Sequence, residues 1–147
     1  MKTTRLVIIL VVLFGSVGCD QVTKVAAREH LEGRETISLV ADTVRLTYAE
    51  NDGAFLGMGS SLPDWVRTLI FTGMVGVFLL GFGIWLFRTG DISKLGAVAC
   101  ALVIGGGVGN LIDRVVFDGS VTDFLNVGVG WLRTGIFNVA DVWIMLG

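Results

Sequence analysis

The chain has 147 residues, of which 53% are hydrophobic and only 16% are charged, and its mean hydropathy is +0.78. This composition excludes an ordinary soluble domain, so we expect an integral membrane protein with a single domain over residues 1–147. The formal net charge of -2 and the pI near 5.2 exclude a nucleic-acid partner, because binding to nucleic acid requires a basic face.

Four apolar segments account for the high hydropathy. We expect membrane spans over about 6–27, 66–87 and 95–112, and an incomplete span over 138–147. About 20 helical residues are needed to cross a hydrocarbon core of about 30 Å. The fourth segment has about ten residues, or roughly 15 Å of helix. Either the chain is a fragment of a longer protein, or it ends in a half-span that would anchor Asp141 poorly. We expect the chain as it stands to be unstable or weakly active.

Basic residues near the spans predict the orientation. Lys2 and Arg5 precede the first span, and Arg88 and Lys94 flank the short connection between the second and third spans. Short loops rich in Lys and Arg remain in the cytoplasm. The N-terminus and the 88–94 connection should therefore be cytoplasmic, and the long connections should lie on the opposite side.

Polar segments between the spans carry local structural signals. Apolar and polar residues partly alternate from Thr36 to Tyr48, which predicts strands at the outer membrane surface. Asn138 with Asp141 three residues later is typical of a helix N-cap and its capping box. The glycines of the third span favour close helix packing, and they lack the flanking residues of a phosphate-binding loop.

Three acids lie at span ends or among apolar residues. Asp113 is followed by Arg114, so a structural ion pair is its default role. Asp123 and Asp141 have no basic neighbour in the sequence. If the fold brings these two together, they would share a proton, as a water-activating aspartic dyad requires. Otherwise, Asp123 is a surface acid and Asp141 is only a helix N-terminal acid.

Other chemistries have less support. The single histidine, His30, lies in a charged stretch and offers little basis for a zinc site or a catalytic triad. A Ser-Lys peptidase would use Lys24 with Ser60 or Ser61, but no motif surrounds these serines. A transport subunit would need polar residues along the middle of its spans, and the second span has few.

Cys19 allows a second interpretation of the N-terminus. Basic residues, an apolar run and small residues before Cys19 are typical of a lipoprotein signal, which would make the chain a lipid-anchored, non-enzymatic protein. Against this, Ser16 stands where such signals prefer a larger aliphatic residue, and further spans follow. A disulfide between Cys19 and Cys100 is not expected, because the two cysteines lie in or near different spans.

Five motifs in order along the chain resemble the lipoprotein signal peptidase family, also called signal peptidase II. They are Asp20–Lys24, Glu50–Phe55, Gly105–Arg114, Val121–Phe124 and Phe137–Asp141. The resemblance implies a membrane α-helical fold, with a four-span bundle, a small extracytoplasmic β-cradle and a periplasmic helix. It also implies an aspartic endopeptidase of the bacterial inner membrane that faces the periplasm, without metal or cofactor.

The resemblance further implies roles for individual residues. Asp123 and Asp141 match the catalytic pair. The positions that match the substrate and inhibitor pocket are Asn51, Gly53, Gly106, Asn110, Arg114, Asn138 and Ala140. Asp20, Lys24 and Asp113 match supporting residues. The implied substrates are diacylglyceryl-modified prolipoproteins, cut on the N-terminal side of the lipidated cysteine. We also expect contact with membrane lipid, inhibition by globomycin-type cyclic peptides, and a monomer.

Overall fold

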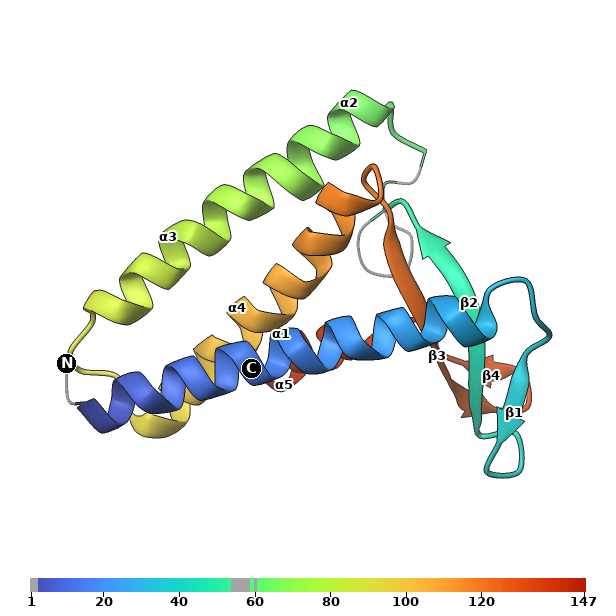
Figure 1. The fold of residues 1–147 in the computed structure, drawn as a ribbon, viewed down its shortest axis with the longest axis horizontal. Coiled ribbons are helices and arrows are strands. Elements are labelled where there is room, and N and C mark those ends of the chain that lie inside the picture. The colour runs from blue at the N-terminus through green and yellow to red at the C-terminus, as the bar shows by residue number, and fades with distance from the viewer. Residues whose placement is uncertain (1–2, 54–58, 60) are drawn as a thin grey trace.

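The computed structural model describes residues 3–53, 59 and 61–147, which form long helices with a small sheet at one end (Figure 1). In chain order the elements are α1 (Thr3–Leu31), β1 (Ile37–Leu39), β2 (Val44–Asn51), α2 (Asp64–Arg67), η2 (Thr68–Met74), α3 (Val75–Arg88), α4 (Lys94–Val116), β3 (Val121–Val129), β4 (Leu132–Arg133) and α5 (Val139–Leu146). The π-helical segment η2 joins α2 and α3 into one helix from Asp64 to Arg88.

Among the described residues, three helices are long and apolar enough to cross a membrane: α1, the helix from Asp64 to Arg88, and α4. Each contains one of the first three apolar segments of the sequence, and the eight-residue α5 lies within the fourth. Large side chains such as Phe14, Val77 and Leu80 are exposed along the helices, as expected for a surface in contact with lipid. The predicted class, a helical membrane protein with a small sheet, is confirmed.

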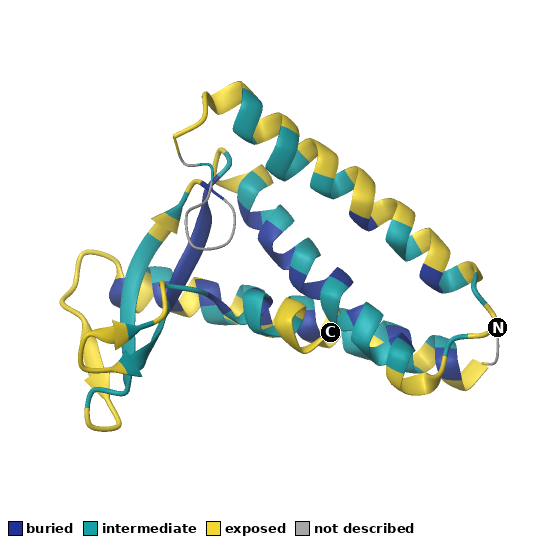
Figure 2. Cartoon of the chain, turned by 180° about the vertical axis from the view of Figure 1, so that it is seen from behind, coloured by how far each residue is buried: buried dark blue, intermediate teal, exposed yellow. Residues whose placement is uncertain are grey.

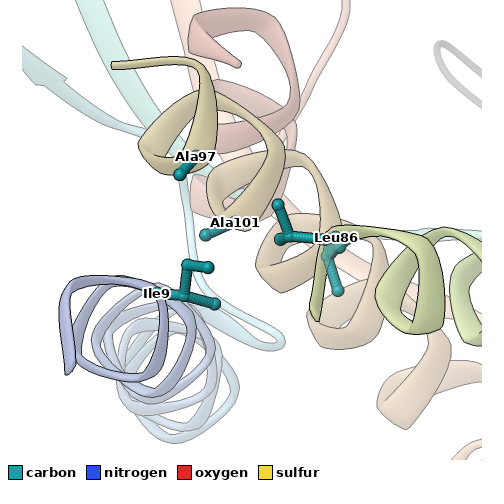
Figure 3. Packing of buried hydrophobic residues seen from close by; sticks show 5 residues of the cluster. Ile9, Leu86, Ala97 and Ala101 are labelled. Atoms are coloured by element: carbon teal, nitrogen blue, oxygen red, sulfur yellow. The ribbon is translucent and has the colours of Figure 1, made fainter. Parts of the chain in front are cut away.

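The helices pack around α4. Figure 2 shows the buried residues gathered mainly on α4, α1 and β3, whereas most of α3 is exposed or half-buried. At the end away from the sheet, Ile9 of α1 and Leu86 of α3 pack against Ala97 and Ala101 of α4 (Figure 3). The small alanine side chains let both neighbouring helices approach the α4 backbone.

Glycines on α4 allow close packing nearer the sheet. A Cβ atom at Gly105 would overlap the Ser16 side chain of α1, and one at Gly106 would overlap the carbonyl oxygen of Ala140 in α5. Because only glycine fits at such contacts, the glycine-rich segment lets α1 and α5 approach two sides of the same helix.

The sheet is antiparallel, with the strand order β1-β2-β3-β4. It lies at the opposite end of the helices from the connection between α3 and α4 (Figure 1). The strands predicted between Thr36 and Tyr48 are present as β1 and the first part of β2. Strand β3 was not predicted. It pairs with β2 so that Asn51 lies opposite Val121 and Ala49 lies opposite Asp123.

Some expectations fall on residues that are not described. Residues 54–58 and 60 lie outside the described residues, and they include Ala54 and Phe55 of the second motif and Ser60 of the Ser-Lys alternative. The separate periplasmic helix that the resemblance implies is not among the elements of the described residues.

Candidate active site

Asp123 and Asp141 lie on either side of one buried amide. Asp123 is in β3 and Asp141 is in the first turn of α5. The amide nitrogen Nδ2 of Asn138 donates to Asp123 Oδ1 at 2.6 Å, and Asn138 Oδ1 accepts from the backbone N–H of Asp141 at 3.0 Å. The fold therefore brings the two predicted acids into one hydrogen-bond network.

Asn110 of α4 forms a second link between these groups. Its Nδ2 donates to Asp141 Oδ1 at 3.0 Å, and its Oδ1 accepts from Asn138 Nδ2 at 3.1 Å. Both asparagines are buried. Since buried amides require partners, this closed network fixes the positions of both side chains.

Asp123 is also held from β2. Asn51 Nδ2 donates to Asp123 Oδ2 at 2.9 Å, and Asn51 Oδ1 accepts from the backbone N–H of Gly53 at 3.0 Å. The turn after β2 therefore orients the Asn51 amide with its donor toward the carboxylate. Both oxygens of Asp123 accept a hydrogen bond.

Asp141 also belongs to the cap of α5. The backbone N–H of Asn138 donates to Asp141 Oδ2 at 3.1 Å, which completes the predicted capping box. The N-terminus of a helix carries a partial positive charge and stabilises an acid in the first turn. The capping interpretation of Asp141 and its place beside Asp123 are thus compatible.

Burial raises the pKa of Asp123 from 3.8 to about 6. Its side chain is only 2% exposed, and the loss of hydration is the largest cause of the shift. The hydrogen bond from Asn51 opposes the shift, and the negative charge of Asp141 adds to it. Two neighbouring carboxyl groups with one raised pKa suit a pair that holds a single proton near neutral pH.

A buried ion cluster lies behind the two acids. Lys24 Nζ is 2.9 Å from Asp20 Oδ2 and 3.4 Å from Asp113 Oδ2, and it donates to Asn110 Oδ1 at 2.8 Å. Asp20 Oδ1 accepts from the backbone N–H of Ala140 at 2.9 Å. The cluster therefore connects α1, α4 and α5. Because buried charges without partners are costly, it strongly disfavours other arrangements of these helices.

The expected pairing of Asp113 with Arg114 is not among the ion pairs of the described residues. Asp113 Oδ2 instead lies near Lys24 Nζ and, at 3.8 Å, near Arg28 Nη1. Consecutive helical residues point about 100° apart, so Arg114 turns away from Asp113. Its Nη2 donates to the carbonyl oxygen of Gly53 at 2.8 Å. Arg114 therefore connects α4 to the turn that orients Asn51.

A largely apolar cavity of about 370 Å³ opens beside Asp141. Phe71 of η2 and Ile144 of α5 contribute apolar walls, and Asn110, Arg114 and Asp141 supply polar groups. The cavity thus places an acid and a guanidinium group against space that suits hydrocarbon. Gly106 and Ala140, which were also predicted to line a pocket, pack against each other where α4 meets α5.

Sequence analysis did not single out two residues of the site. Gln21 Nε2 donates to the Gly109 carbonyl oxygen at 3.1 Å and to Asp113 Oδ1 at 3.2 Å. Arg28 Nη1 donates to Thr122 Oγ1 at 2.7 Å. The four-residue spacing of Asp20, Lys24 and Arg28 places them on one helix face and could have identified Arg28. Gln21 has no comparable spacing signal.

The lipoprotein interpretation conflicts with the path of α1. The helix continues without a break through Cys19, and Asp20 and Lys24 after it are fully buried. Cleavage before Cys19 would remove the half of α1 that carries Ile9 into the core. Cys19 and Cys100 are both free thiols. His30 is exposed, and no group of three or more potential metal ligands occurs within the described part of the chain.

Comparison with known proteins agrees with this arrangement. A family model described as signal peptidase (SPase) II, Peptidase_A8, matches residues 8–147. A lipoprotein signal peptidase of Chlorobium phaeobacteroides is 36% identical, over 87% of this chain and 77% of that protein. One from Clostridioides difficile is 31% identical, over 97% of this chain and 88% of that protein.

The fold is also similar to a solved structure. A bacterial membrane enzyme determined by the in meso method at 2.3 Å resolution matches with a TM-score of 0.77 and 26% sequence identity. The match covers 99% of this chain and 83% of that chain. The chain therefore belongs to the signal peptidase II family of membrane aspartic peptidases, which remove signal peptides from prolipoproteins.

Proposed function

We propose that Asp123 and Asp141 are the catalytic dyad of this peptidase. The observation that carries the proposal is that Asn138 and Asn110 link the two carboxylates, of which Asp141 lines an apolar cavity. The proposed substrate is a prolipoprotein with a diacylglyceryl-modified cysteine, cut on the N-terminal side of that cysteine.

The reaction needs one ionised and one protonated carboxyl group. The ionised group takes a proton from water as the water oxygen attacks the peptide carbonyl carbon, and the protonated group gives its proton to the carbonyl oxygen. When the resulting diol collapses, the carbon–nitrogen bond breaks and the amine takes the proton that came from water. The diol returns the other proton to the second carboxyl group, so the dyad regains its starting state.

The cavity supports a lipid-modified substrate. Its apolar walls between η2, α4 and α5 suit the hydrocarbon of a diacylglyceryl group. Arg114 and Asn110 at its polar end offer donors to the carbonyl oxygens of a peptide. We propose that Asn51, Gly53 and Asn138 complete the substrate-binding region, and that globomycin-type cyclic peptides occupy the same space and block cleavage.

We further propose a membrane location, an orientation and an oligomeric state for the enzyme. Arg5 lies near the start of α1, Arg88 ends α3 and Lys94 begins α4, and these helix ends are the ones away from the sheet (Figure 1), which supports a cytoplasmic position for that end. The dyad would then face the periplasm at the outer surface of the inner membrane. Residues 1–147 would act as one peptidase domain, as a monomer.

Mutation of each aspartate tests the proposal. Purified protein would be incubated with a diacylglyceryl-modified prolipoprotein, and cleavage followed by gel shift. Asp123→Asn and Asp141→Asn should each abolish cleavage, whereas Asp91→Asn, at an exposed acid in the connection between α3 and α4, should retain it. Cleavage by either dyad variant at the wild-type rate would disprove the assignment.

The position of the cut and the effect of the inhibitor provide a second test. Mass spectrometry of the product should find the lipidated cysteine at its N-terminus. Globomycin should protect the substrate in proportion to its concentration. A product cut elsewhere would contradict the proposed specificity, while leaving the dyad assignment intact.

A further inference from the structure

The orientation of the Asn110 amide is set by a charged residue that does not touch the dyad. Lys24 Nζ donates to Asn110 Oδ1 at 2.8 Å, and Asn138 Nδ2 donates to the same oxygen at 3.1 Å. An ammonium group can only donate hydrogen bonds. A reversed amide would place its NH₂ group against two donors, so the oxygen must face Lys24.

This constraint directs the other end of the amide at Asp141. Asn110 Nδ2 donates to Asp141 Oδ1 at 3.0 Å, and the backbone N–H of Asn138 occupies Oδ2. Neither donor can become an acceptor: the first is fixed by Lys24, and the second is a backbone group. Two donated hydrogen bonds and the partial positive charge at the N-terminus of α5 stabilise the ionised form of Asp141, so the network favours the carboxylate.

Asp123 has a different environment. It also accepts two amide hydrogen bonds, but it lies on a strand and gains nothing from a helix N-terminus. Burial raises its pKa to about 6, and the positive charge of Lys24 opposes this by less than burial contributes. Of the two acids, Asp123 is therefore better suited to hold the proton.

The charged groups around Asp141 come from three sides. Asp123 of β3 and Arg114 of α4 interact with it electrostatically, and Lys24 and Asp20 of α1 act through Asn110 and the Ala140 backbone. Toward the cavity, η2 and α3 contribute the apolar residues Phe71 and Val75. Of these charges, Lys24 is the one that determines which way the Asn110 amide points.

We propose that Lys24 is a positioning residue for the dyad: by holding Asn110 Oδ1, it keeps Asp141 ionised and leaves the shared proton on Asp123. The inference rests on the proposed role of Asp123 and Asp141 as catalytic residues. Asp141 is then the base that activates water, and Asp123 is the acid that protonates the carbonyl oxygen of the substrate.

The pH profile of kcat/KM tests the role of Lys24. Substituting Lys24 alone leaves Asp20 and Asp113 buried without their nearest cation. The comparison is therefore between Asp20→Asn and the double variant Asp20→Asn/Lys24→Met, in which one charge of each sign is removed. Asn at position 20 keeps an oxygen for the Ala140 N–H. The acid limb of the double variant should lie about one pH unit above that of Asp20→Asn.

A purely structural role would lower kcat/KM by the same factor at all pH values and leave the acid limb in place, and that result would overturn the proposal. The failure of the dyad assignment itself is distinguishable, because Asp123→Asn or Asp141→Asn would then still cleave. If the acid limb of the pH profile does not move, and Asp123→Asn and Asp141→Asn are both inactive, only the proposed role of Lys24 is rejected.

Infrared spectroscopy tests the location of the proton without changing Lys24. The carbonyl stretch of a protonated buried carboxyl group should titrate near pH 6 in the wild type. It should disappear in Asp123→Asn and persist in Asp141→Asn, with a lower midpoint because the neighbouring charge is gone. The opposite pattern, with the band lost only in Asp141→Asn, would overturn the assignment even if the double variant failed to fold.

Discussion

Asp20 Oδ1 accepts a hydrogen bond from the backbone N–H of Ala140 at 2.9 Å, across 120 positions of sequence. This bond attaches the first helix to the first turn of α5, next to Asp141. We predict that Asp20→Ala lowers the free energy of unfolding by about 1–3 kcal/mol, because it leaves the Ala140 N–H and Lys24 short of a partner. Thermal unfolding in detergent would measure it, and Asp20→Asn, which keeps an acceptor, should lose less. Equal losses would show that the acceptor is unimportant.

The buried Asp123 should make stability depend on pH. Its folded pKa of about 6 lies above the value of 3.8 that it has without the fold. Between these values the folded chain holds a proton that the unfolded chain releases, so stability falls as the pH rises through this window. Asp123→Asn avoids this loss and should be more stable than the wild type at pH about 7, by on the order of 2–3 kcal/mol.

This advantage should disappear below about pH 3, where Asp123 is protonated in both states. Thermal unfolding at a series of pH values would measure the difference between the two proteins. The exposed Asp91→Asn serves as the control and should follow the wild type throughout. A difference between Asp123→Asn and the wild type that does not vary with pH would contradict the assigned cause.

Gly106→Ala should damage both packing and activity. The added methyl group would overlap the Ala140 carbonyl oxygen and push α5, with Asp141, away from α4. Overpacking of this kind costs about 1–3 kcal/mol. Gly81→Ala on α3 is the matched control, since a Cβ there meets no atom within 4 Å. Cleavage and the unfolding midpoint would be measured for both variants. If Gly106→Ala matched Gly81→Ala in both measurements, the close approach of α5 to α4 at Gly106 would be refuted.

Tyr48, the single tyrosine of the chain, should ionise late. Burial, followed by the hydrogen bond and charge of Glu50, raises its pKa to about 12. Because no other tyrosine contributes, the tyrosinate absorbance of the folded protein can be titrated directly. Glu50→Gln should lower the midpoint, because it removes a negative charge from beside the phenol. An unchanged midpoint would exclude Glu50 as a cause of the shift.

The long helices were predictable because a membrane span requires a long, continuous run of apolar residues. A helix that crosses it needs about 20 apolar residues, and the second and third segments meet that length. The capping box at Asn138 and Asp141 was also readable, since it depends on residues three positions apart. Both features are local, so no knowledge of the folded chain was needed.

Strand β3 and the ion cluster could not be predicted in the same way. Val121, Thr122, Asp123 and Phe124 are all buried, because this strand is covered on both faces, and no alternation remains in the sequence. The partner of Asp113 is Lys24, from another helix, rather than the adjacent Arg114. Such pairings depend on how helices dock, and a single sequence does not encode that in any short pattern.

The placement of Asp123 on β3 and Asp141 on α5 has a consequence for biosynthesis. The ribosome makes α1 and α4 first, so Lys24 and Asp113 can meet before either acid of the proposed dyad has been translated. Asn110 gains its hydrogen bonds to Asn138 and Asp141 only later, because both residues follow α4 and β3 in the chain. A nascent chain would therefore have no proteolytic capacity during insertion, and activity would begin only when α5 docks.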